Sequence, residues 1–165
     1  LFKDLLVLYK NNRKLFVGDE GVCEMVDFQF VMLTNCTFLE NIGSAISTPL
    51  HEDIHKTYLT KIEMLDKYAT EIELLWSTED GKLAGTFVKQ YKELLHAMYK
   101  QQIFINHLHK INTDESPLSS EEFKKQAKKK ATESGLYDII NTIDNTFNRI
   151  IDDNVEQCII KSIRL

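Results

Sequence analysis

The sequence predicts an all-α protein, an up-down four-helix bundle of long amphipathic helices with a short helix in front. Apolar residues recur every three or four positions over long stretches, which is the period of a helix with one buried face. The six glycines and two prolines fall almost entirely between these stretches, where turns are expected. A chain of 165 residues with 43% hydrophobic content is sufficient for one core, so residues 1–165 are expected to form a single domain.

The first elements are predicted to be a short helix and then a long one. Leu1 to Phe16 has a helical pattern, and the segment 17–21, which contains Gly18 and Gly21, ends it. One continuous helix is predicted from Val22 to Ile46, because a single apolar stripe runs through it. The members of this stripe are Met25, Phe28, Met32, Cys36, Leu39, Gly43 and Ile46.

Two further long helices are predicted in the middle of the chain. Ser47-Thr48-Pro49, with Glu52 just after, supplies a capping residue, a proline for the first turn and an acidic charge near the positive end of the dipole. The helix that starts there is expected to reach Ser77, with the stripe Ile54, Tyr58, Ile62, Leu65, Ala69, Ile72 and Trp76. After a turn at 78–81, the next helix carries Phe87, Tyr91, Leu94, Leu95, Met98, Gln102, Ile105 and His109 on one side. Short turns require these neighbours to run antiparallel.

The last third of the chain predicts a crossover and a fourth long helix. Residues 112–120 form a polar loop, and 123–133 form a short basic helix in the crossover. This basic helix is expected to lie outside the bundle and to be more mobile than the long helices, because Phe123 is its only large apolar residue. After Gly135 the stripe Leu136, Ile140, Ile143, Phe147, Ile151, Asn154, Cys158 and Leu165 predicts one helix to the end.

Charge and hydropathy exclude some classes of function. A formal net charge of −5 argues against nucleic-acid binding, which requires a basic face. No apolar run approaches the roughly 20 residues that span a bilayer. Because the sequence starts with Leu1 and not Met, a signal peptide could precede it, and no localisation is assigned.

The residues offer little catalytic chemistry. No nucleophile elbow, cysteine–histidine signature or phosphate-binding glycine loop is present. Two Glu-x-x-His motifs, Glu52 to His55 and Glu93 to His96, suggest a di-metal site in a bundle. The two histidines are offset by about 13 Å along their helices, so one site cannot use both. Glu93 and His96 are also expected to face water. No enzyme activity, metal or cofactor is predicted.

The three cysteines, Cys23, Cys36 and Cys158, lack the spacing of metal ligands, and their odd number excludes a fully paired framework. Cys36 and Cys158 are predicted to be buried on their stripes and not bonded to one another. The alternative is one disulfide and one spare thiol in a secreted protein.

Two surfaces are candidates for contact with a partner. Lysines cluster on the basic helix at Lys124, Lys125, Lys128, Lys129 and Lys130, where they could bind an acidic partner or an anionic membrane, or simply face solvent. Phe30, Val31 and Phe38 lie off the main stripe of 22–46. Either the N-terminal helix covers them, or they form an apolar contact surface for a partner or membrane.

A pair of histidines is a candidate pH-sensitive element. His51 and His109 lie equally far from the turn near Asp80, so an antiparallel pair of helices places them at one level. If both rings are close and partly buried, their pKa values fall and acid destabilises the fold. The rival interpretation is two unrelated histidines at a frayed helix end.

Together these observations predict a non-enzymatic helical-bundle interaction module that binds a protein partner through helix faces. The alternative is a secreted, membrane-active bundle whose amphipathic helices rearrange onto lipid. A metal-dependent bundle enzyme is the third hypothesis.

Overall fold

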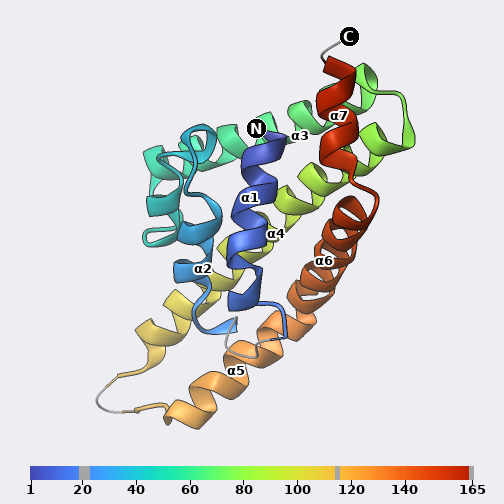
Figure 1. Ribbon diagram of the computed structural model, residues 1–165. Helices are drawn as coiled ribbons and strands as arrows, with labels where there is room; N and C mark the ends of the chain where they lie inside the picture. Colours follow the sequence, from blue (N-terminus) through green and yellow to red (C-terminus); the bar gives the residue numbers. More distant parts are fainter. Residues whose placement is uncertain (19–22, 114–115, 164–165) are drawn as a thin grey trace.

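A computed structural model describes residues 1–18, 23–113 and 116–163, with side chains described as far as residue 159. Every regular element in these ranges is a helix, which confirms the all-α class. The α-helices are α1 (Phe2–Asn12), α2 (Val26–Leu33), α3 (Glu52–Leu75), α4 (Glu79–Ile111), α5 (Ser120–Glu133), α6 (Leu136–Asp152) and α7 (Val155–Ile163). Short 3-10 turns cover Arg13–Leu15, Thr37–Leu39 and Gly43–Ile46. Figure 1 shows α4 running diagonally through the molecule behind α1, with α6 and α7 along one side.

Helices α3 and α4 form the antiparallel pair that the sequence predicts, and they pack more extensively than any other two elements. Only Trp76, Ser77 and Thr78 separate them. The Thr78 side chain caps α4 by accepting a hydrogen bond from the Gly81 amide at 3.2 Å. Gly81, expected in the turn, therefore lies in the first turn of α4, where its missing side chain leaves room for the carbonyl group of Trp76.

The predicted helix from Val22 to Ile46 is wrong. Among the described residues 23–46 only α2 is α-helical, and its buried residues Val26, Gln29, Phe30 and Leu33 are out of step with the predicted stripe, whereas Val22 lies outside the described residues. Thr34 is the C-cap residue of α2, and its hydroxyl group donates to the carbonyl oxygen of Phe30 at 2.9 Å. The following Asn-Cys-Thr run has low helix propensity, and Asn41 adopts a left-handed conformation with φ 70°.

The predicted fourth helix is broken near Asn154, which has φ 52° and separates α6 from α7. Asn tolerates this left-handed conformation better than most residues, and two aspartates of low helix propensity precede it. The break changes the buried face, so that Val155 and Ile159 are buried on α7 and Cys158 is exposed.

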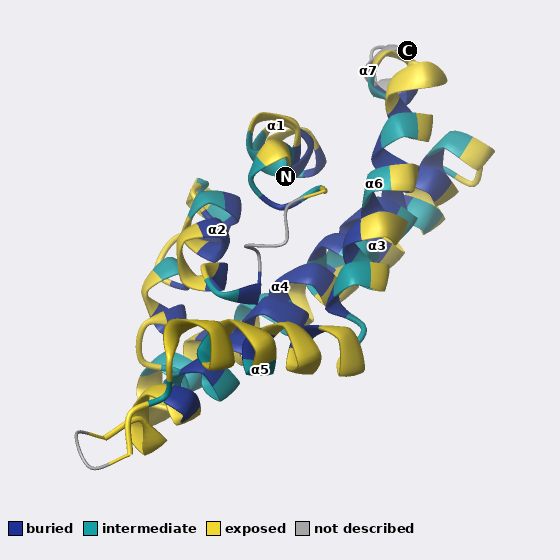
Figure 2. Cartoon of the chain, turned by 90° about the horizontal axis from the view of Figure 1, so that it is seen from below, coloured by how far each residue is buried: buried dark blue, intermediate teal, exposed yellow. Residues whose placement is uncertain are grey.

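The core lies around α4, whose residues are buried along most of its length (Figure 2). Helix α1 packs on α2 and α4, as expected for an N-terminal cover. Tyr9 of α1 donates a hydrogen bond to the Asp144 carboxylate of α6 at 3.1 Å, and Arg13 pairs with the same carboxylate at 2.6 Å. The N-terminal part of the chain and α6 are thus joined through the Asp144 carboxylate.

The basic helix α5 does not lie outside the bundle, which corrects the prediction for 123–133. It packs on α4 and α6, because Ala127 and Ala131 are small enough for a close approach and are fully buried. The buried Gln101 amide group of α4 donates to the carbonyl oxygen of Ala127 at 2.9 Å. Ala127 and Ala131, four residues apart, therefore form the buried face of this helix, which a pattern of large apolar residues does not reveal.

The cysteine prediction holds in part. No disulfide joins Cys36 to Cys158. Their predicted burial is wrong, since Cys36 is half-buried in the extended segment after α2 and Cys158 is exposed. Cys23 is the buried cysteine.

Candidate functional site

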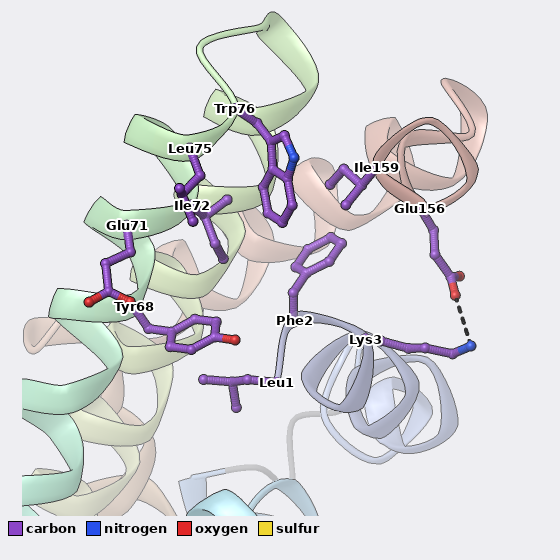
Figure 3. Close-up of a pocket in the computed structure, with 10 residues that line it drawn as sticks. All are labelled: Leu1, Phe2, Lys3, Tyr68, Glu71, Ile72, Leu75, Trp76, Glu156 and Ile159. Carbon is purple, nitrogen blue, oxygen red and sulfur yellow. Dashed lines mark ion pairs between the residues drawn. The ribbon is translucent and has the colours of Figure 1, made fainter. Parts of the chain in front are cut away.

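The main candidate site is a pocket of about 250 Å³ between α1, α3 and α7. It is larger than the roughly 150 Å³ cavity that holds benzene in an engineered protein core, so an aliphatic or aromatic group fits. Figure 3 shows Phe2 of α1 opposite Ile72 of α3 and Trp76, the residue after α3, with Ile159 of α7 at the side. The full lining is Leu1, Phe2, Lys3, Tyr68, Glu71, Ile72, Leu75, Trp76, Glu156 and Ile159.

Helical periodicity explains why α3 contributes one wall. Tyr68, Ile72 and Trp76 are spaced four residues apart, so they project from the same side of the helix over its last two turns. Phe2 supports the facing wall by packing edge-on against Phe87 of α4, with ring centroids 6.1 Å apart. Apolar side chains from three separate helices therefore converge on the pocket.

Trp76 is held close to the backbone of Gly81. Its amide donates to the carbonyl oxygen of Ile72 at 3.0 Å, and its backbone then leaves the helical region with φ −119° and ψ 84°. A side-chain carbon on Gly81 would lie only 1.8 Å from the Trp76 carbonyl oxygen. The position of Trp76 thus depends on a glycine at 81.

Charged and polar groups stand at the rim. Lys3 and Glu156 form an ion pair at 3.5 Å across one side of the pocket (Figure 3). On the opposite side Glu71 is exposed and makes neither an ion pair nor a hydrogen bond with any residue that the structure describes. The rim therefore carries one neutralised pair and one carboxylate without a counter-charge.

Beside the pocket, large apolar side chains reach solvent. Leu74 is 77% exposed and Leu75 is 75% exposed, more than any other large apolar residue described. Single exposed leucines are common on protein surfaces, but two adjacent ones beside an apolar pocket extend the apolar area beyond it. This group of Leu74, Leu75 and the pocket is called the α3-end surface below.

The histidine pair predicted as pH-sensitive is not assembled as expected. His51 and His109 are both exposed, and the His109 ring packs on Phe123 of α5 with centroids 4.8 Å apart. The predicted burial of the two rings is therefore wrong, because α3 begins only at Glu52 and His51 precedes its first turn.

The lysines of α5 are all exposed. Lys129 pairs with Glu133 at 3.8 Å, and the Lys130 ammonium group lies 5.8 Å from the Phe104 ring centroid. Lys124, Lys125 and Lys128 are exposed as well. The solvent-facing interpretation of the cluster accounts for this arrangement, and nothing in it defines a ligand.

The predicted apolar contact surface at Phe30, Val31 and Phe38 is not formed. Phe30 is fully buried in the core, and only Val31 is exposed. Phe38 is half-buried against Tyr68, with the Lys61 ammonium group 5.1 Å from its ring centroid. The prediction is wrong because α2 ends at Leu33, so Phe38 does not share a helix face with Phe30.

A second cluster, which the sequence analysis missed, joins α3 to α4. The rings of Tyr58 and Tyr99 stack with centroids 4.0 Å apart and an interplanar angle of 8°. His55 Nδ1 lies 3.0 Å from the Tyr99 hydroxyl group, and His96 Nδ1 lies 2.9 Å from the Tyr58 hydroxyl group. Each helix thus supplies one histidine and one tyrosine, and each histidine bonds the tyrosine of the other helix.

A sequence signal for this cluster was available. Both helices contain His-x-x-Tyr, His55 to Tyr58 and His96 to Tyr99, a spacing that puts ring and ring on one helix face. The expectation that His96 faces water is wrong, since it is half-buried, whereas Glu93 is exposed. The two histidines are offset along their helices, and the stacked rings of Tyr58 and Tyr99 lie between them and connect them.

Electrostatics favour the neutral form of this cluster. Burial raises the pKa of Tyr58 well above its usual value, so its hydroxyl group keeps its proton and shares a hydrogen bond with His96 Nδ1. Burial, and then the nearby ammonium groups of Lys100 and Lys92, lower the pKa of His96. The cluster is therefore arranged around an uncharged His96.

We expect acid to weaken the fold through His96. Its folded pKa lies below the unfolded value of about 6.5, so the unfolded chain binds the proton more readily and stability falls as pH drops below about 6.5. Urea melts between about pH 7.5 and pH 5 measure this loss. His96→Gln should flatten the pH dependence, whereas His107→Gln, at an exposed position of the same helix, should not. Equal pH profiles for wild type and His96→Gln would refute the assignment.

Among the described residues, no three histidine, cysteine, aspartate or glutamate side chains lie together in a way that could hold a metal ion. None of the described helices combines the length and apolarity needed to cross a membrane. Comparison with protein-family models, curated proteins and solved structures finds no match to this chain. Inference about function must therefore start from the site.

Proposed function

We propose that this chain is a non-enzymatic helical-bundle interaction module, and that it binds a protein partner by taking an apolar side chain of that partner into the pocket between α1, α3 and α7. The observation that carries the proposal is the α3-end surface, an apolar pocket beside two leucines that are about three-quarters exposed. Protein interfaces concentrate binding energy where an aliphatic or aromatic anchor fills such a pocket inside a polar rim.

Membrane contact is the weaker candidate. Leu74 and Leu75 could touch lipid, but carboxylates at Glu71, Glu79 and Asp80 lie within the same turn region and would be repelled by an anionic membrane surface. A protein partner can offer complementary charges to these groups, whereas a lipid surface of fixed sign cannot.

Peptide selection tests the proposed function. Peptides selected from a random library on the wild-type protein should lose at least about tenfold in affinity for Leu75→Glu, a difference of about 1.4 kcal/mol. The substitution places a charge beside the pocket without touching the core, because Leu75 is 75% exposed. Trp76, the single tryptophan of the chain, lines the pocket, so its emission should shift when these peptides bind.

Leu59→Glu is the matched control. Leu59 is an exposed leucine of the same helix, about 24 Å from Leu75 along the axis. Selected peptides should bind this variant as they bind the wild type. Peptides that bind Leu75→Glu undiminished, or that bind without changing Trp76 emission, would place the interaction elsewhere and contradict the proposal.

A further inference from the structure

The rim of the pocket discriminates between occupants by charge. The Lys3 ammonium group is already engaged by Glu156 at 3.5 Å, so an anion that approaches must compete with this carboxylate. Glu71 stands on the other side without a counter-charge, and Lys67, one helical turn earlier, forms no ion pair with it among the described residues. An anionic group would face two carboxylates, whereas a cation would complete an ion pair.

A second polar group lies within reach of the same occupant. The Tyr68 ring lines the pocket, and Figure 3 shows its hydroxyl group directed toward the space beside Leu1 and Phe2, away from α3. No hydrogen-bond partner for this hydroxyl group is found among the described residues. Tyr68 and Glu71 are three residues apart, so they offer an acceptor-rich edge to whatever fills the apolar part.

We infer that the occupant of the pocket is a cationic, apolar segment of a protein: an aliphatic or aromatic anchor with a lysine or arginine within about one helical turn, whose cation pairs with Glu71. This inference rests on the proposed function and adds the chemistry of the partner. It separates the partner from fatty acids and anionic lipid headgroups, whose negative charge would lie against Glu71. The net charge of −5 also favours the approach of a basic segment over longer distances.

Three matched probes test the charge preference. 4-Phenylbutylamine, 4-phenylbutanol and 4-phenylbutyrate each carry a phenyl ring on a four-carbon chain, and they end in an ammonium group, a neutral hydroxyl group and a carboxylate, respectively. Titration at low ionic strength, followed by Trp76 emission, should rank the amine first, the alcohol second and the carboxylate last. We expect the amine to bind about threefold tighter than the alcohol, as is typical of an exposed ion pair, and to lose this advantage in about 0.5 M salt.

Substitutions at Glu71 locate the charge effect. Glu71→Gln should make amine and alcohol bind equally, and Glu71→Lys should reverse the order in favour of the carboxylate. Glu63→Gln, which changes an exposed glutamate two turns earlier on α3, should leave the wild-type order unchanged. Both positions are at the surface, so the three variants should remain folded.

The outcomes distinguish the two proposals. Equal binding of amine and carboxylate, or a preference for the amine that survives in Glu71→Gln, would overturn the cationic partner while leaving the apolar pocket as a binding site. Failure of all three probes to bind would overturn the pocket as a binding site and this inference with it.

Discussion

Gly81→Ala should lower the free energy of unfolding by about 3 kcal/mol, although alanine is a better helix former than glycine. The added carbon would lie 1.8 Å from the Trp76 carbonyl oxygen and 2.6 Å from the Trp76 side-chain carbon Cβ. Relief requires a shift of the backbone at the junction of α3 and α4, where the Trp76 amide bonds Ile72 and the Gly81 amide bonds Thr78. Helix propensity alone would predict a gain of about 1 kcal/mol, so the sign of the change decides between the two effects.

Urea denaturation followed by far-ultraviolet circular dichroism measures the change. The control is Lys82→Ala in the same turn, which removes only the exposed ion pair with Glu79 and should cost less than about 1 kcal/mol. Because Trp76 lines the pocket, Gly81→Ala should also change its emission and weaken binding of the phenyl probes. A Gly81→Ala protein as stable as the wild type would show that Trp76 is not held as described.

Asp144→Ala should cost about 3 kcal/mol of stability, because it breaks a largely buried ion pair and leaves its partners unsatisfied. The Asp144 side chain is 13% exposed and accepts from both Tyr9 and Arg13. Burial, and then the Asp144 charge, raise the pKa of Tyr9 far above its usual value, so the phenol remains a donor that needs an acceptor. Loss of the carboxylate would leave the Tyr9 hydroxyl group without a hydrogen-bond acceptor inside the core.

Two further variants separate charge from hydrogen bonding. Asp144→Asn keeps an acceptor for Tyr9 but removes the ion pair, so its loss of stability should be smaller than that of Asp144→Ala. Asp138→Ala removes an exposed carboxylate in the first turn of the same helix and should cost less than about 1 kcal/mol. Equal melting midpoints for Asp144→Ala and Asp138→Ala would show that the contact between α1 and α6 adds nothing to stability.

The parts of the fold that the sequence predicted well are those in which periodicity and propensity agree. In α3 and α4 one apolar stripe continues for several turns, so the two helices and their antiparallel pairing were predicted, although α3 begins only at Glu52 and Gly81 lies inside α4. Between Val22 and Ile46 the apolar residues happen to keep a helical spacing, but Thr34 and Asn41 favour local conformations that end the helix. Low helix propensity after Leu33 and the left-handed conformation of Asn41 outweighed the spacing there.

The candidate site was harder to predict than the fold. The pocket combines residues 1–3, 68–76 and 156–159, and none of these segments contains a motif that points to the others. The histidine pair was sought by equal distance from the turn, which led to His51 and His109. The Glu-x-x-His motifs at His55 and His96 suggest metal ligands, whereas these histidines form hydrogen bonds with Tyr99 and Tyr58.

The contacts of α1 with α6 and α7 affect when, during folding, the pocket is first complete. Tyr9 and Asp144 are 135 residues apart in the sequence, and Lys3 meets Glu156 beside the pocket. Closing so long a loop costs more entropy than the local pairing of α3 with α4, so we expect these contacts to form after that pair. During synthesis the pocket therefore stays incomplete until residue 159 has left the ribosome, and a nascent chain that already holds α3 and α4 cannot yet engage a partner through it.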